Sequence, residues 1–84
     1  MPEVETPDGW EREGDAFIKE FEFDTFDDAI QFMASSVEPI NELNHHPTWT
    51  NTYNKVTVEL SSHDAGTVTD RDVRLALILD QLAR

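Results

Sequence analysis

Alternation of apolar and polar residues predicts a β-hairpin near the start of the chain. In residues 16–23, three phenylalanines fall on one face and two glutamates on the other, which is typical of a strand with one buried side. The apolar face holds Phe17, Phe21 and Phe23. Residues 9–13 form a shorter candidate strand, and a turn signal at residues 13–15 joins the two strands.

A helical period follows this hairpin. Thr25 is a suitable N-cap, because its hydroxyl can accept a hydrogen bond from the first turn of a helix. The apolar residues that then recur at helical spacing are Phe26, Ala29, Ile30, Met33 and Val37. We expect this stripe to pack on the phenylalanine face of the hairpin. Pro39 removes one helical hydrogen bond, so we also expect a kink or a break near residues 36–38, followed by a further turn.

The second half of the chain repeats the order of strand, strand and helix. Residues 49–62 predict another hairpin, with Asn54-Lys55 as its two-residue turn. Thr69 is a second N-cap, and its helix is expected to end near Leu82. The helix residues expected near the core are Val73, Ala76, Leu77, Ile78 and Leu79. The order ββαββα predicts an α+β fold, in which a four-stranded antiparallel sheet has its helices packed on one face.

The length of 84 residues is enough for one domain, which we expect to span residues 9–84. Residues 1–8 carry two prolines and three acidic residues and predict a flexible acidic lead-in. A core of this size is small, so an interface that buries more apolar surface is expected. We therefore predict a homodimer or a homotetramer.

Composition narrows the function classes. Eighteen acidic residues against six basic ones give a formal net charge of −12, which disfavours direct nucleic-acid binding and anionic membranes. The chain has no cysteine, so disulfides and thiolate metal sites are excluded. It shows neither a long apolar run nor a signal-peptide pattern, and we expect a cytoplasmic protein. The acidity fits either an ordinary acidic protein or one from a high-salt (halophilic) cytoplasm.

Three histidines, His45, His46 and His63, are the side chains whose ordinary pKa lies near neutrality. Pro47 favours an extended backbone at His46, so His45 and His46 are expected to point to opposite sides. Three interpretations remain open from these residues alone. They are polar surface histidines, a three-histidine metal site without a recognisable ligand framework, and general acid–base catalysis.

The spacing around these histidines resembles the signature of the pterin-4a-carbinolamine dehydratases. In that family His-His-Pro follows a usually charged residue after three positions, and an aromatic residue, a histidine and an aspartate come later. The corresponding residues here are Asn41, His45, His46, Pro47, Tyr53, His63 and Asp72. Further similarity lies in Gly9-Trp10, Phe21-x-Phe23, Phe32-Met33 and residues 53–56, so it covers roughly residues 9–82. Two residues depart from the pattern, Asn41 in place of a charged residue and Pro39 within the helix.

The resemblance implies a lyase of pterin recycling. Its substrate would be a 4a-hydroxytetrahydropterin such as the tetrahydrobiopterin derivative, its products quinonoid dihydropterin and water, and it would need no cofactor. The resemblance implies that His45 and His63 form the acid–base pair and that His46 assists. Asp72 would orient a histidine or position the substrate, unless it serves only as a helix cap. The remaining expected polar contacts to the pterin are Asn44, Ser61, Ser62 and Asp64.

The remaining expectations concern two aromatic residues near the histidines and two functions that are alternatives to the dehydratase. Trp49 and Tyr53 are candidates to stack on the pterin, although core packing is the expected role of Tyr53. A non-catalytic protein-binding or dimerisation module is one alternative function. A relative that acts in molybdopterin-linked metabolism is another, since fold and motif do not separate it from the first.

Overall fold

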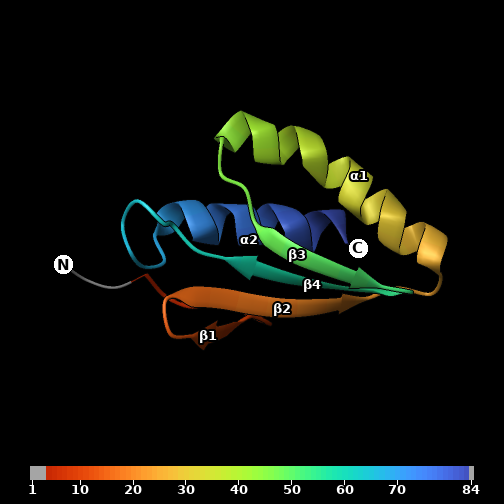
Figure 1. The fold of residues 1–84 in the computed structure, drawn as a ribbon, viewed down its shortest axis with the longest axis horizontal. Coiled ribbons are helices and arrows are strands. Elements are labelled where there is room, and N and C mark those ends of the chain that lie inside the picture. Colours follow the sequence, from red (N-terminus) through yellow and green to blue (C-terminus); the bar gives the residue numbers. More distant parts are fainter. Residues whose placement is uncertain (1–3, 84) are drawn as a thin grey trace.

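The computed structural model describes residues 4–83. Its elements are β1 (Glu11–Glu13), β2 (Ala16–Glu22), α1 (Phe26–Leu43), β3 (Thr48–Thr52), β4 (Lys55–Leu60) and α2 (Asp70–Leu82). The strands form one antiparallel sheet in the order β1-β2-β4-β3, and both helices lie on the same side of it (Figure 1). The predicted α+β fold and the element order are confirmed.

The centre of the sheet is the pairing of β2 with β4. Phe17 lies opposite Leu60 and Phe21 opposite Val56, and all four side chains are buried. Glu20 and the other glutamate of β2 are exposed, as the alternation of this strand predicted. The period-two pattern therefore identified the buried face of β2 correctly.

The first helix differs from the prediction in two respects. It continues through Pro39 without a break. Ser35, whose carbonyl loses its helical donor to the proline, is an exposed residue, so water can take the place of that donor. In addition, the side chains of Phe26, Ile30 and Val37 are exposed, and the prediction that they pack on the sheet is wrong.

The buried face of α1 consists of Ala29, Phe32, Ser36 and Ile40. This set shares Ala29 with the predicted stripe, has similar helical spacing and otherwise lies beside it on the helix. Phe32 decides between the two faces, because its ring contacts Phe21 and Phe23 with centroid distances of 4.9 and 5.2 Å. The hydroxyl of Ser36 donates to the Phe32 carbonyl at 2.7 Å, which satisfies a polar group in the core.

The turn of the second hairpin lies one residue earlier than predicted. It comprises Tyr53 and Asn54, and Tyr53 adopts a left-handed backbone with φ of 51°. Asn51 stabilises the turn by donating to the carbonyls of Tyr53 and Lys55. The Tyr53 side chain is 67% exposed, so the expectation that it packs in the core is wrong.

The second helix begins after Thr69 and ends at Leu82, as predicted. Its buried residues include Ala76 and Leu79, whereas Leu77 is 57% exposed, which corrects its expected place in the core. Near its end, Asp80 accepts from the Trp10 indole at 3.1 and 3.2 Å and from the Lys19 ammonium at 2.8 Å. These contacts join Trp10, which precedes β1, and Lys19 of β2 to α2.

The expected acidic lead-in makes contact with the domain. Pro7 is buried, and Val4 packs on the core. Residues 1–3 lie outside the described residues. Over residues 4–83, neither helix is long and apolar enough to cross a membrane.

Candidate active site

The end of α1 turns His45 towards the protein interior. Asn44 is the C-cap in a left-handed conformation with φ of 52°, which asparagine tolerates better than most residues. The His45 amide donates to the Ile40 carbonyl at 3.3 Å, a bond that closes the helix end. After this reversal the His45 side chain is buried, with 8% exposure.

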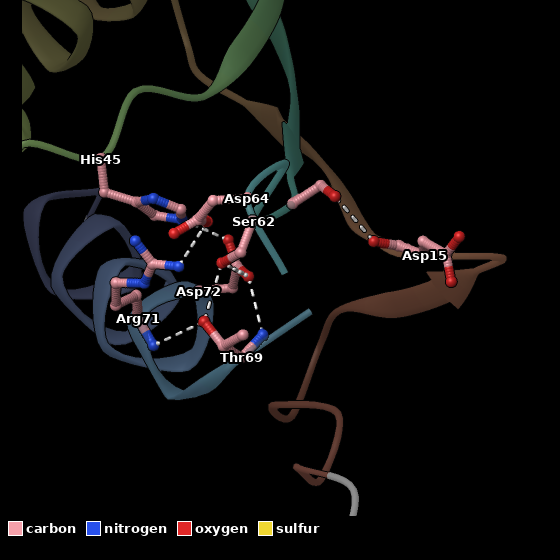
Figure 2. A network of polar contacts seen from close by, with 8 residues as sticks. Asp15, His45, Ser62, Asp64, Thr69, Arg71 and Asp72 are labelled. Atoms are coloured by element: carbon pink, nitrogen blue, oxygen red, sulfur yellow. Dashed lines mark hydrogen bonds and ion pairs between the residues drawn. The ribbon is translucent and has the colours of Figure 1, made fainter. Parts of the chain in front are cut away.

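His45 meets a buried carboxylate across the fold. Its Nε2 lies 2.5 Å from Oδ1 of Asp72, which belongs to the first turn of α2 and is fully buried. The second oxygen of Asp72, Oδ2, accepts from the Ser62 hydroxyl at 2.8 Å and from the Thr69 amide at 2.9 Å. Figure 2 shows these four residues converging from the end of α1, the loop after β4 and the start of α2.

Hydrogen-bond donors surround the buried carboxylate of Asp72. A carboxylate removed from water is costly unless donors replace its hydration. Here the Ser62 hydroxyl and the Thr69 amide do so, and the amide groups at the N-terminus of α2 add a favourable partial charge. An ionised Asp72 accepts hydrogen bonds only, so the His45 nitrogen that faces it carries a proton.

His46 points away from this network, as the following proline predicted. It is exposed, and its Nε2 lies 3.2 Å from Oδ1 of Asn41. Asn41 thus supplies a neutral acceptor at the position where the resemblance leads us to expect a charged residue. A hollow of about 160 Å³ adjoins this pair, and it is lined by Val37, Ile40, Asn41, His46, Pro47 and Trp49.

His63 lies on a loop that several contacts hold in place. The Ser61 hydroxyl donates to the Asp15 carbonyl, and Ser62 forms an isolated β-bridge with Thr67. Arg12 Nη2 donates to the Thr67 hydroxyl at 3.2 Å. The His63 side chain is exposed and has no hydrogen-bond or ion-pair partner among residues 4–83.

A further ion pair joins this loop to α2. Arg71 Nη2 donates to Asp64 Oδ1 at 2.6 Å. This hydrogen bond holds the pKa of the Asp64 carboxyl below its ordinary value of 3.8, and it raises the pKa of Arg71 in turn. Both groups lie at the surface, so salt should weaken their attraction.

The structure therefore brings some of the expected site residues together and separates others. His45, Ser62 and Asp72 form one buried network, whereas His46 lies outside it and contacts Asn41 of α1. Asn44, His63 and Asp64 are exposed. No group of three or more His, Cys, Asp or Glu side chains within residues 4–83 is arranged to hold a metal ion.

Two residues with a part in this network did not stand out as site residues in the sequence. Thr69 was identified only as a helix N-cap, yet its hydroxyl lies 2.7 Å from that of Ser62. The Thr69-x-x-Asp72 spacing of a capping box is the signal that places these two residues together. Arg71 gave no comparable signal, because its contact with Asp64 depends on how the loop folds.

Comparison with known proteins agrees with this architecture. The family model described as pterin 4 alpha carbinolamine dehydratase matches residues 2–82. A Rhizobium meliloti protein provisionally named pterin-4-alpha-carbinolamine dehydratase is 45% identical over 78 residues, covering 90% of this chain and 75% of the relative. A Thermomicrobium roseum protein with the same provisional name is 43% identical over 75 residues, covering 89% of this chain and 81% of its own.

Two solved structures share the fold. The transcriptional coactivator/pterin dehydratase from Brucella melitensis has a TM-score of 0.89 and 35% identity, with 92% of this chain and 84% of that chain covered. A pterin dehydratase-like protein, identified as a RuBisCO assembly factor in the alpha-carboxysome, has a TM-score of 0.72 over 88% and 86% of the two chains. At 19% identity it shows the fold alone. The matches over nearly the whole chain show that this protein belongs to the pterin-4-alpha-carbinolamine dehydratase family of enzymes.

Proposed function

We propose that this protein is a carbon–oxygen lyase that converts a 4a-hydroxytetrahydropterin into quinonoid dihydropterin and water, without a cofactor and in the cytoplasm. Family membership supports the reaction class. The observation that carries the proposed mechanism is the buried His45–Asp72 pair. A histidine held by a buried carboxylate has a fixed ring orientation, which proton transfer to a bound substrate requires.

The proposed reaction needs one acid and one base. The C4a–O bond breaks with its electron pair on oxygen, and because hydroxide is a poor leaving group, an acid protonates that oxygen to release water. A base removes the proton from N5, and the electrons of the N5–H bond form the C4a=N5 double bond. Imidazole side chains suit both tasks, since their ordinary pKa lies near neutrality.

His45 and His63 are the proposed acid–base pair. His45 is oriented by Asp72, and His63 is exposed on a loop that is held from several sides, so it is free to meet a substrate. His46, which lies beside the hollow that Trp49 also lines, is proposed to assist binding while Trp49 stacks on the pterin ring.

The other residues expected to contact the pterin fall into an exposed group and a buried group. Asn44 and Asp64 are exposed and remain proposed contacts to the pterin, as does Ser61, which is partly exposed. Ser62 and Asp72 are fully buried and have partners inside the protein. We propose that these two act through His45 and do not touch the substrate.

The test of this proposal is stopped-flow dehydration of synthetic 4a-hydroxytetrahydropterin. We expect the protein to accelerate the decay well above the rate in buffer. A folded protein that leaves the decay at the buffer rate would contradict the dehydratase proposal. Comparing pterins with different side chains at C6 would then identify the preferred substrate.

A second candidate is a non-catalytic protein-binding role. The observation in its favour is the exposed apolar stripe on α1, formed by Phe26, Ile30 and Val37, together with the shared fold of the RuBisCO assembly factor. The same stripe supports our proposal of a homodimer or a homotetramer, because exposed apolar patches commonly mark interfaces. Absence of dehydration combined with a stable complex with another protein would favour the protein-binding role.

A further inference from the structure

We infer that Ser62 and Thr69 are positioning residues that, through Asp72, fix His45 with its proton on Nε2 and so make Nδ1 the nitrogen that exchanges protons with the substrate. The inference concerns the tautomer of His45, and its catalytic consequence rests on the proposed function. Four side chains form a continuous series of hydrogen bonds between the start of α2, the loop after β4 and the end of α1 (Figure 2). They are those of Thr69, Ser62, Asp72 and His45, and the protons that each can donate determine the tautomer of His45.

The direction of each hydrogen bond follows from the chemistry of the groups. The ionised Asp72 has no proton, so the hydroxyl of Ser62 donates to its Oδ2. A serine hydroxyl has one proton, and the Ser62 oxygen must therefore accept in its contact with the Thr69 hydroxyl, which lies at 2.7 Å. Thr69 in turn accepts the Arg71 amide at 3.3 Å. Each hydroxyl in the chain thus has a defined donor and acceptor role.

This chain holds the Asp72 carboxylate in place beside the His45 ring. The Ser62 hydroxyl and the Thr69 amide both hold Oδ2, which leaves Oδ1 directed at His45 Nε2. In the neutral imidazole one nitrogen carries the proton and the other a lone pair. With the proton on Nε2, the lone pair is on Nδ1.

The other ring nitrogen of His45 is not fully buried. Within residues 4–83, the His45 ring has no further hydrogen-bond partner, and no fully buried side-chain nitrogen or oxygen lacks one. Nδ1 is therefore accessible from solvent although the residue as a whole is buried. A neutral His45 accepts a proton at Nδ1, and a protonated His45 donates one from the same atom, so either step of the dehydration uses Nδ1.

The direct test is nitrogen-15 NMR of the His45 ring, which distinguishes a protonated Nε2 from a protonated Nδ1. We expect the neutral wild-type ring to carry its proton on Nε2. Ser62→Ala leaves Oδ2 one donor short and the Thr69 hydroxyl without its acceptor. We expect the carboxylate then to move away from Nε2 in part of the molecules, which gives a mixture of tautomers. The kcat of this variant should fall about tenfold, as is usual for a residue that orients a reacting group, with little change in KM.

Matched variants separate this role from general destabilisation. Thr69→Ser retains the hydroxyl and should keep the wild-type tautomer and kcat, whereas the isosteric Thr69→Val should resemble Ser62→Ala. Ser61→Ala removes a neighbouring hydroxyl that donates to the Asp15 carbonyl, outside the His45 network, and it should leave the His45 tautomer unchanged.

A wild-type ring with its proton on Nδ1 would overturn the inference. So would a wild-type tautomer and kcat in both Ser62→Ala and Thr69→Val. The NMR result does not require turnover, so a protein without dehydratase activity but with the predicted tautomers would contradict the proposed function and support the positioning role.

Discussion

The imidazole of His45 and the carboxylate of Asp72, 27 positions apart in the sequence, form a buried pair that joins the end of α1 to the first turn of α2. Asp72 also completes the capping box of α2 by accepting from the Thr69 amide. One carboxylate therefore caps the start of a helix and also contacts a histidine.

Replacing Asp72 by Asn should reverse the tautomer of His45. Ser62 and the Thr69 amide both donate to one side of this residue, so they will select the amide oxygen and turn the NH₂ group towards His45. The imidazole must then accept at Nε2, which moves its proton to Nδ1. We expect kcat to fall by about 100-fold or more, with a smaller change in KM, when steady-state dehydration is measured.

Asp70→Asn is the matched control for this prediction. Asp70 is an exposed acid in the same helical turn, and its replacement changes the same charge without touching His45. Asp70→Asn should therefore retain the activity of the wild type. Equal activities of Asp72→Asn and wild type would refute the orienting role of Asp72.

Asp80 should contribute to the stability of the domain. It accepts from both Trp10 and Lys19, and Trp10 is buried in the core. Asp80→Asn removes the charge opposite Lys19 but leaves an acceptor for the indole. Because the ion pair is partly exposed, we expect a loss of only about 0.5–1.5 kcal/mol in the free energy of unfolding, measured by urea denaturation. Glu59→Gln, at an exposed position of β4, should have no comparable effect.

The ion pair of Asp64 and Arg71 should depend on pH at the acidic end. The hydrogen bond from Arg71 lowers the pKa of Asp64 in the folded protein from 3.8. The contribution of the ion pair to stability is therefore complete above pH 3.8 and is lost as the pH falls through the lowered pKa. Carboxyl carbon-13 NMR should show this titration. In Arg71→Gln the pKa of Asp64 should return towards 3.8, and molar potassium chloride should act in the same direction. An unchanged Asp64 titration in the variant would show that Arg71 does not hold the carboxylate.

The exposed stripe of α1 should form the subunit interface. Ile30→Asp places a charge in the middle of this stripe without altering the buried face of the helix. We expect the variant to be smaller than the wild type in sedimentation velocity experiments while its circular dichroism stays the same. Gln31→Asp, an exposed substitution next to it, is the control. A wild type that sediments as a monomer would exclude this interface.

Local patterns were sufficient to predict most of the fold. The alternation along β2 identified its buried face, and Thr25 and Thr69 marked the starts of both helices. The buried face of α1 was not predictable in this way, because two stripes had equal helical spacing. Contacts of Phe32 with the sheet decided between them, and such contacts depend on tertiary packing.

The candidate site was predictable only in part. Pro47 led to the correct expectation that His45 and His46 face opposite sides. Spacing along the chain does not tell, however, which of the two is buried. That depends on the left-handed turn at Asn44, which directs His45 towards α2. The contact between the Ser62 and Thr69 hydroxyls likewise arises only when the loop after β4 meets the helix.

The central proposal is that His45, oriented by Asp72, acts with His63 in acid–base catalysis of pterin dehydration. Its most direct test is the single-turnover rate of 4a-hydroxytetrahydropterin dehydration by wild type and by His45→Ala, each checked for a folded sheet by circular dichroism. We predict that the variant loses about 10²- to 10⁴-fold of the rate above buffer, the usual contribution of a general acid or base. A folded His45→Ala variant that dehydrates the substrate as fast as the wild type would contradict the claim.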